Sequence, residues 1–347
     1  MKKMKKKIMV FRFSAMGDVA MTVPVIKALT EQNSEVKVQV VSRPFFAPFF
    51  TSLENVEFIP ADFKTEYKGF LGLIKLFGKL KNYYPDAIAD LHDVLRTKVL
   101  RNLFGISGKQ VVSINKGRKE KKALTRKKNK IFKTLKSTHE RYADVFRKLG
   151  YKVDLQNTQP LSQPEMSSQL ALFMQTFEGN KIIGIAPFAA HRGKQYPLEK
   201  IKKTIEILLE KDPGLNIVLI GGGKEEKKKL DELEKINRNR IVNITGIFSF
   251  EEELQLISRL DKLLSMDSGN AHIAALFGVP VITIWGATHP YAGFAPFGQP
   301  EENHILPDRK KYPQLPTSIY GNKTFEDFEK IWEDIHEEEI AAKLLMK

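Results

Sequence analysis

Short apolar runs alternate with longer segments of helical periodicity along almost the whole chain. A parallel strand buried on both faces is a continuous apolar run, whereas a helix shows apolar residues every three or four positions. In the first half, the pattern predicts strands at Ile8–Phe13, Val36–Val41, Val56–Ile59, Ala87–Leu91 and Gln110–Ser113. Helices are predicted between them, notably over Val19–Thr30 and Phe70–Lys81. This alternation is typical of β-α units on a parallel sheet.

A second set of such units follows a break in the pattern. Asp154–Pro164 is polar, contains prolines and lacks periodicity, which indicates a linker between domains. The strands expected after it are Ile182–Ala186, Ile217–Ile220, Ile241–Ile244, Lys262–Ser265 and Val279–Trp285. The expected helices are Leu198–Glu210, Glu225–Asn237, Phe250–Ser258 and Asn270–Phe277. We therefore predict two open α/β domains in tandem.

The C-terminal residues carry a different pattern. Phe325–Leu345 is acidic and has the apolar spacing of one amphipathic helix, with Phe325, Phe328, Ile331, Trp332, Ile335 and Ile340 on the apolar face. Such a helix either packs on one domain or straps the two together. The predicted parts are thus residues 1–160, residues 161–324 and a C-terminal helix over residues 325–347.

Charge divides the chain further. With 347 residues the chain is longer than one hydrophobic core usually supports, and its 56 Lys and Arg against 41 Asp and Glu give a net charge of +15. Residues 1–7 hold five Lys and no acid, and residues 116–136 hold eleven Lys or Arg and one acid, Glu120. The remainder is balanced, which excludes a uniformly basic, histone-like protein. The two basic segments suit an anionic surface, either nucleic acid or membrane.

Several classes of protein are excluded by what the sequence lacks. Without cysteine there is no disulfide scaffold, thiol nucleophile or cysteine-ligated metal site. Arg12 and Asp18 interrupt the apolar stretch after the basic start before it reaches the length of a signal-peptide core. No later segment has the roughly 18 uncharged apolar residues of a transmembrane helix. We expect a cytosolic protein.

Candidate chemistry lies where predicted strands run into helices, because ligands of parallel sheets gather at the carboxyl ends of the strands. After the first strand, Asp18 is either a helix N-cap or a base that accepts a proton from a substrate hydroxyl. After Lys262–Ser265, backbone amides near Ser268 and Gly269 suit phosphate oxygens. His272, one turn further on, is either a buried helix residue or a phosphate ligand.

Two further junctions are candidate anion sites. The loop after Ile182–Ala186 contains three potential cations, His191, Arg192 and Lys194, which either neutralise a diphosphate or form a solvated basic loop. Gly221–Glu225 resembles a phosphate-binding turn but lacks both common glycine fingerprints. Glu225 either accepts hydrogen bonds from ribose hydroxyls or lies exposed. We find no metal-ligand spacing and no G-x-S-x-G nucleophile motif, so electrostatic stabilisation without a metal is the simplest interpretation.

Two long segments resemble the lipopolysaccharide heptosyltransferases, glycosyltransferase family 9. Arg12–Leu29 (RFSAMGDVAMTVPVIKAL) resembles the opening motif of that family. Asp267–Val281 (DSGNAHIAALFGVPV), continuing through Gly286–Pro290, is similar to its donor-site signature. Shorter matches are Asp90–Thr97 and Arg192–Pro197, and the resemblance as a whole spans residues 8 to about 298.

The resemblance implies a GT-B fold, with two Rossmann-like domains facing across a cleft, the first binding the acceptor and the second the nucleotide sugar. It implies inverting transfer of a heptose from ADP-heptose to the lipopolysaccharide inner core, with no metal ion and no cofactor. Asp18 would be the general base, and Lys194 would bind the donor phosphates. The other donor-binding residues would be Glu225, Asp267, Ser268, Gly269 and His272. The acceptor-binding residues would be Ser14, Met16, Gly17, His92 and Arg96.

The acceptor of this family is a phosphorylated lipid sugar at the inner face of the cytoplasmic membrane. We therefore expect a peripheral protein on that face, attracted through residues 1–7 and 116–136, although residues 116–136 could also be a solvated face or a mobile loop. A nucleic-acid-binding protein is the competing class, but the charge is confined to two segments and no nucleic-acid-binding motif is present. A GT-B enzyme with another nucleotide sugar, or a nucleotide-sugar epimerase, stays open as an alternative.

Overall fold

A computed structural model of the chain describes residues 5–177 and 180–346, and it divides into two compact units. The first unit is Met1–Lys116 with Lys136–Pro160, and the second is Gly117–Leu135 with Leu161–Lys347. The chain thus passes between the units three times. One passage lies within the polar Asp154–Pro164 segment, but Gly117–Leu135 groups with the second unit, whereas the sequence analysis assigned it to residues 1–160.

The first unit is built on five parallel strands in the order β3-β2-β1-β4-β5. The strands are β1 (Lys6–Phe11), β2 (Val36–Ser42), β3 (Val56–Pro60), β4 (Ala87–Asp90) and β5 (Gln110–Ser113). In register, Phe11 of β1 is opposite Val41 of β2 and Asp90 of β4. The ends of these central strands are therefore level, and the residues that follow them come together at one edge.

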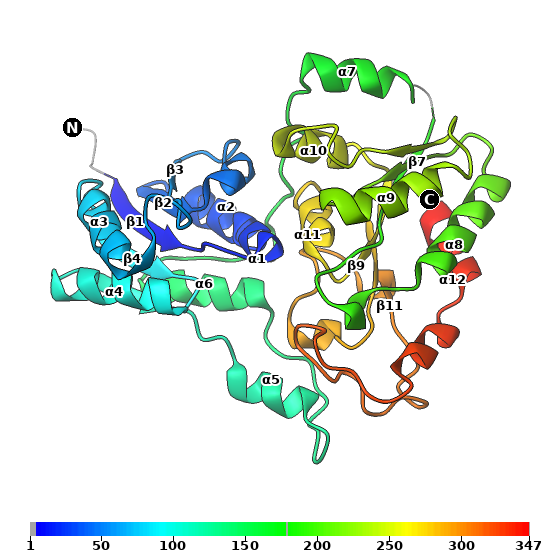
Figure 1. The fold of residues 1–347 in the computed structure, drawn as a ribbon. Coiled ribbons are helices and arrows are strands. Elements are labelled where there is room, and N and C mark those ends of the chain that lie inside the picture. Colours follow the sequence, from blue (N-terminus) through cyan, green and yellow to red (C-terminus); the bar gives the residue numbers. More distant parts are fainter. Residues whose placement is uncertain (1–4, 178–179, 347) are drawn as a thin grey trace. The chain divides into compact units, whose positions relative to one another are not determined.

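Six helical elements accompany this sheet (Figure 1): α1 (Met16–Ala20), α2 (Val23–Gln32), the 3-10 helix η1 (Pro44–Phe49), α3 (Gly69–Lys81), α4 (Leu95–Ile106) and α6 (Thr138–Lys148). α3 and α4 contact each other and share a core with Met9, Phe11 and Ile88 of the sheet. The single helix predicted over Val19–Thr30 is wrong, because it is two helices. Pro24 follows the break, at a position where its missing N–H costs no helical hydrogen bond.

The second unit has six parallel strands in the order β11-β10-β9-β6-β7-β8. They are β6 (Ile182–Ala186), β7 (Asn216–Leu219), β8 (Ile241–Asn243), β9 (Lys262–Met266), β10 (Val281–Ile284) and β11 (His304–Ile305). Its α-helices are α5 (Arg118–Thr125), α7 (Ser168–Gln175), α8 (Leu198–Lys211), α9 (Gly223–Glu234), α10 (Phe250–Ile257), α11 (Gly269–Leu276) and α12 (Glu337–Leu345). The 3-10 helices are η2 (Arg192–Lys194), η3 (Pro290–Ala292), η4 (Glu301–Asn303) and η5 (Phe328–Asp334). The predicted α/β class, with two parallel sheets, is confirmed.

The continuous helix predicted over Phe325–Leu345 is wrong. Asp327 has φ 58°, and His336 is extended at φ −98° and ψ 136°, so the segment is divided into η5 and α12. Its apolar residues still join the core of the second unit, where α12 contacts α8, β9 and β10. Within the described residues, no helix is both long and apolar enough to cross a membrane.

Candidate functional site

Asp18 lies in the first turn of α1, directly beyond the carboxyl end of β1. Ala15 occupies the N-cap position, so Asp18 is not the N-cap that one interpretation expected but the third residue of the helix. Its Oδ2 accepts a hydrogen bond from the backbone N–H of Ala15 at 3.4 Å and forms an ion pair with Arg12 Nη2 at 2.7 Å. Among the described residues both contacts are made by Oδ2. The side chain is 31% exposed, enough for a substrate to reach it.

Buried contacts of Arg12 fix this carboxylate in place. Its side chain is only 7% exposed, and Nη1 donates to the backbone oxygen of Leu91 at 2.9 Å. The guanidinium also lies 5.9 Å from the ring centre of Tyr142, whose hydroxyl donates to the backbone oxygen of Asp18 at 3.4 Å. Burial raises the pKa of Tyr142, so it remains a neutral donor. β1, β4 and α6 thus hold Asp18 in one orientation.

The loop between β4 and α4 places His92 beside this pair. The carboxylate of Asp90, fully buried, accepts hydrogen bonds from the backbone N–H groups of His92 and Asp93 and an ion pair from Arg101 at 3.0 Å. His92 Nδ1 in turn accepts a hydrogen bond from the N–H of Phe13 at 3.4 Å. His92 was predicted as a site residue and Asp90 was not, although a carboxylate at the last position of a buried strand is a signal of such a role.

Four cations lie around His92 in the first unit. The pKa of His92 is lowered from 6.5 to about 3. Burial is the largest cause, followed by the positive charges of Arg12, Lys116, Arg43 and Arg96. Arg12, Arg43 and Lys116 come after β1, β2 and β5, and Arg96 lies in the first turn of α4. Sequence analysis named only Arg96 as a ligand. The sheet topology gathers the other three, and their spacing along the chain gives no sign of it.

In the second unit, Lys194 and Asp267 form a buried pair. Lys194 ends η2 after β6, Asp267 follows β9, and their Nζ and Oδ2 atoms are 2.9 Å apart. The side chains are only 16% and 8% exposed. Ser268 is the N-cap of α11, and its hydroxyl pairs with that of Ser265 at 3.1 Å rather than capping the helix. Lys194, Asp267, Ser268 and Gly269 are therefore brought together, as the sequence analysis expected.

Close backbone packing fixes the loop that carries Lys194. The N–H of Ala287 donates to the oxygen of Gly193 at 2.6 Å. A Cβ on Gly193 would lie 2.5 Å from the oxygen of Gly321, so only glycine fits here. Tyr196, just after this loop, donates its hydroxyl to the oxygen of Ile335 at 2.9 Å. The segment that contains η5 and α12 thus supports the loop of Lys194.

The remaining donor-site candidates differ in burial. His272, in the first turn and a half of α11, is 8% exposed. Glu225 in α9 has a side chain 83% exposed and pairs with Lys228 at 3.5 Å. Its neighbour Glu226 accepts a hydrogen bond from the N–H of Gly222 at 2.7 Å and so closes the glycine turn. Glu225 is not brought into contact with the Lys194–Asp267 pair in the described contacts.

A cavity of about 450 Å³ opens beside η2. His191 and Arg192 line it, and Arg192 forms an ion pair with Glu329 at 2.9 Å. Of the three cations predicted in this loop, only Lys194 joins the Asp267 junction in the described contacts. Within residues 5–177 and 180–346, no group of three or more His, Asp or Glu side chains could hold a metal ion.

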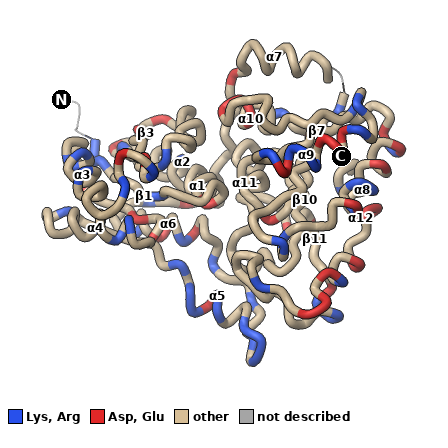
Figure 2. The backbone as a smooth tube through the Cα atoms, viewed as in Figure 1, with Lys and Arg blue, Asp and Glu red and all other residues tan. Residues whose placement is uncertain are grey.

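The basic segment Gly117–Leu135 is anchored to the second unit rather than being a mobile loop. Leu124 and Leu135 are buried in a cluster with Ala292, and the N–H of Leu135 donates to the oxygen of Tyr291 at 2.9 Å. Phe132 packs on the same cluster. Figure 2 shows the tube around α5 mostly in the colour of Lys and Arg. The exposed cations of the segment include Lys119, Lys122, Arg126, Lys127, Lys128 and Lys133. The other basic segment, residues 1–7, lies outside the described residues up to residue 4.

Two contacts of this segment use cations. Lys130 Nζ donates to the backbone oxygens of Gln314 and Pro316 at 2.7 and 2.6 Å, and burial, then the charge of Arg309, lowers its pKa to about 8. The guanidinium of Arg309 lies 3.3 Å from the ring centre of Phe132. The segment therefore packs through Leu124, Phe132 and Leu135 together with these two cation contacts.

The chain is similar to known proteins in both sequence and fold. The family model described as glycosyltransferase family 9 (heptosyltransferase) matches residues 73–323. The lipopolysaccharide core heptosyltransferase OpsX of Haemophilus influenzae is 26% identical over 290 residues, 82% of this chain and 80% of OpsX. The family 9 glycosyl transferase structure from Veillonella parvula has a TM-score of 0.73 at 19% identity, covering 99% of this chain and 98% of that one. The E. coli heptosyltransferase WaaC with ADP-2-deoxy-2-fluoro heptose has a TM-score of 0.64 at 16% identity, covering 97% and 98%.

Proposed function

Because this chain belongs to glycosyltransferase family 9, and is a glycosyltransferase with the GT-B fold, we propose that it transfers a heptose from ADP-heptose to the lipopolysaccharide core. The family match over residues 73–323, which includes the Lys194–Asp267 pair, carries the proposal. The name of OpsX supports the acceptor, and the ADP-sugar bound to WaaC supports the donor.

The proposed reaction is a single displacement that inverts the anomeric carbon. The acceptor oxygen forms a bond to that carbon while the bond from the carbon to the diphosphate oxygen breaks. The hydroxyl proton passes to Asp18 Oδ1, and Arg12 holds the other carboxylate oxygen in place. Asp18 belongs to the first unit and Lys194 to the second.

The departing ADP gains negative charge, which the second unit is equipped to stabilise. The ammonium of Lys194 and the first amides of α11, near Ser268 and Gly269, would bind the diphosphate without a metal ion. Asp267 holds Lys194 in place, and Lys194 neutralises a carboxylate that would otherwise repel the phosphates. His272 would complete the phosphate site, and Glu225 would contact the ribose.

The cations of the first unit fit a phosphorylated acceptor. Arg43, Arg96 and Lys116 would bind anionic groups beside His92, and the turn from Ser14 through Met16 and Gly17 would position the sugar hydroxyl next to Asp18. The acceptor proposed is lipid-linked. We therefore also propose a cytoplasmic protein that binds the inner face of the membrane peripherally, attracted by residues 1–7 and by the exposed cations of Gly117–Leu135.

Replacing the proposed base tests the mechanism. Asp18→Ala should lower the rate of heptose transfer by at least about a hundredfold, because no other group accepts the proton. ADP-heptose should still stabilise the variant against heat as it does the wild type, since its binding groups lie in the second unit. Transfer is measured by ADP release in the presence of a deacylated core acceptor, with and without EDTA, and donor binding by thermal shift.

Glu54→Ala, which removes an exposed carboxylate from the same unit, is the matched control and should transfer at the normal rate. Near-normal turnover by Asp18→Ala would refute the base assignment. A thermal shift with UDP- or GDP-linked sugars and none with ADP-heptose would refute the donor.

A further inference from the structure

Large apolar side chains are exposed in the first turns of α3 and α4. Phe70, Leu71 and Ile74 of α3 are 63%, 79% and 43% exposed, and Leu95, the first residue of α4, is 79% exposed. The inner side of α3 is meanwhile filled by Leu73, Leu76 and Leu80, which are buried in the core of the first unit. The start of α3 is thus apolar on both sides, a property of helices that have apolar surroundings all round.

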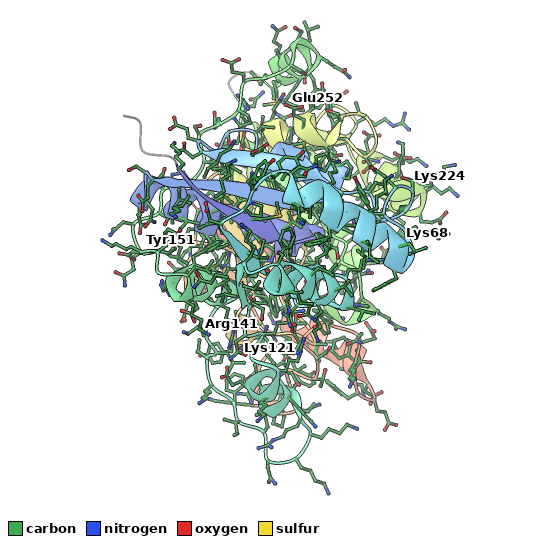
Figure 3. The ribbon with its side chains drawn as sticks, turned by 90° about the vertical axis from the view of Figure 1, so that its left-hand side faces the viewer. Lys68, Lys121, Arg141, Tyr151, Lys224 and Glu252 are labelled. Atoms are coloured by element: carbon green, nitrogen blue, oxygen red, sulfur yellow. The ribbon has the colours of Figure 1, made fainter. Side chains whose placement is uncertain are left out.

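Both helices are basic and contain no acid. Lys68–Lys81 has four Lys, and α4 has Arg96, Lys98 and Arg101, yet neither stretch contains an Asp or Glu, although the chain has 41 of them. Lys68, at the N-cap of α3, is labelled in Figure 3. Lys75 and Lys79 lie with their ammonium groups 5.7 and 5.6 Å from the ring centre of Tyr67. Such side chains cover apolar surface with their stems while the charged ends remain in water.

This surface adjoins the edge of the sheet that carries the proposed acceptor site. α3 and α4 each start after a strand, so their first turns lie at the carboxyl edge, where Asp18 and His92 are also found. Aromatic contacts connect the two regions. Phe63, just before α3, lies 5.4 Å from the guanidinium of Arg96 and 4.5 Å, ring to ring, from Phe13.

We propose that Phe70, Leu71, Ile74 and Leu95 insert into an anionic lipid bilayer, and that the exposed cations at α3 and α4 bind its headgroups. These cations are Lys68, Lys75, Lys81, Arg96 and Lys98. Glu66 and Asp93 pair with Lys75 and Lys98 at the border of this surface, but the two helices themselves carry only cations. Apolar side chains beside Lys and Arg match the layered chemistry of acyl chains and anionic headgroups. A second copy of the chain is a poor occupant, because a two-fold contact would set one basic rim against the other. The choice of a bilayer rests on the proposed function, in which the acceptor is lipid-linked.

Insertion makes a different prediction from simple charge attraction. Apolar contact with the bilayer survives salt that screens charges, since the Debye length falls to about 3 Å at 1 M. Phe70→Ser with Leu71→Ser should therefore weaken binding to vesicles of phosphatidylglycerol and phosphatidylcholine about tenfold in high salt. Ile106→Ser is the matched control, because Ile106 is 86% exposed at the opposite end of α4 and should bind as the wild type does. Binding is measured by co-sedimentation.

A fluorescent reporter tests insertion directly. The two native tryptophans, Trp285 and Trp332, are each only 1% exposed, so a tryptophan introduced by Leu71→Trp reports on its own surroundings. Vesicles with brominated acyl chains should quench it and shift its emission to the blue, and should leave Ile106→Trp unaffected. Absence of quenching at position 71, or equal vesicle binding by the double serine variant, would overturn the proposal. So would a wild-type dimer in sedimentation that the double serine variant dissociates.

Transfer assays separate this proposal from the proposed function. With a soluble, deacylated acceptor, the double serine variant should transfer at the wild-type rate, whereas transfer to a vesicle-embedded acceptor should fall with binding. If no variant and no wild type transfers heptose, the proposed function fails, while the sedimentation and quenching results still decide whether the surface inserts.

Discussion

At the residue scale, Asp18 in the first unit and Asp267 in the second each pair with a largely buried cation at the edge of the sheet. Arg12 binds Asp18 at 2.7 Å in the first unit, and Lys194 binds Asp267 at 2.9 Å in the second. The two pairs differ in exposure. In the first pair the carboxylate of Asp18 is accessible, whereas in the second pair both side chains are nearly buried. A base needs access to a proton, whereas a diphosphate site needs a fixed charge. The two pairs therefore match the two roles proposed for them.

His92 should make the first unit sensitive to acid. Its pKa is lowered from 6.5 in the unfolded chain to about 3 in the folded unit. Between pH 6.5 and pH 3, His92 therefore binds a proton in the unfolded chain but not in the folded unit. Stability is therefore present above pH 6.5 and is lost as the pH falls toward 3. From pH 7 to pH 5 this costs about 2 kcal/mol. Thermal unfolding followed by circular dichroism at both values should show a smaller decrease for His92→Asn than for the wild type.

His289 supplies the background for that comparison. Burial, followed by the charges of Arg309, His304 and Lys130, lowers its pKa to about 4, so the second unit loses stability over a similar range in both proteins. Only the difference between wild type and His92→Asn reports on His92. Identical pH dependence of the two would show that His92 does not resist protonation.

At the scale of elements, apolar runs sufficed to predict nearly every strand, because parallel strands covered on both faces are continuously apolar. The errors occur where local geometry interrupts a continuous pattern. α1 ends at Ala20, and α2 begins at Val23 with Pro24 in its first turn. Asp327 is the N-cap of η5, and the extended His336 separates η5 from α12. The junctions of Asp18 and Asp267 were found because they directly follow strands. Arg43 and Lys116 were missed, since only the strand order brings them beside His92.

The basic segment Gly117–Leu135 shows the same limit, because the sequence contains its apolar residues but does not show that they pack against Ala292 and Tyr291. Phe132 packs against Arg309 and Tyr291. Phe132→Ala should therefore lower the free energy of local unfolding of the segment by about 1–3 kcal/mol. Trypsin should then cleave between Arg126 and Lys133 at least about fivefold faster, as measured by mass spectrometry of the fragments. Ile131→Ala, at a neighbouring residue that is 49% exposed, should leave cleavage unchanged. Equal cleavage of both variants would mean that Phe132 is not the anchor.

At the scale of the whole molecule, the net charge of +15 is unevenly divided. The basic segment Gly117–Leu135 holds nine Lys or Arg and one acid and belongs to the second unit, while the apolar surface of α3 belongs to the first. The chain passes from the first unit to the second at residue 117 and returns at residue 136, so both units are connected through this basic segment. In the two proposals, the second unit binds an anionic membrane by charge, and the first unit binds it by charge with insertion.

These two contributions should separate by salt. Each cation near an anionic surface contributes about 1 kcal/mol, so Lys127→Ser with Lys128→Ser should weaken binding to phosphatidylglycerol vesicles by up to about thirtyfold at low salt. In high salt the difference from the wild type should vanish, because screening removes the attraction from both proteins. Lys202→Ser with Lys203→Ser removes the same charge from two adjacent exposed positions on α8 and serves as the control. Should the control weaken binding as much, net charge rather than the basic segment would govern attraction; co-sedimentation across a salt series decides between them.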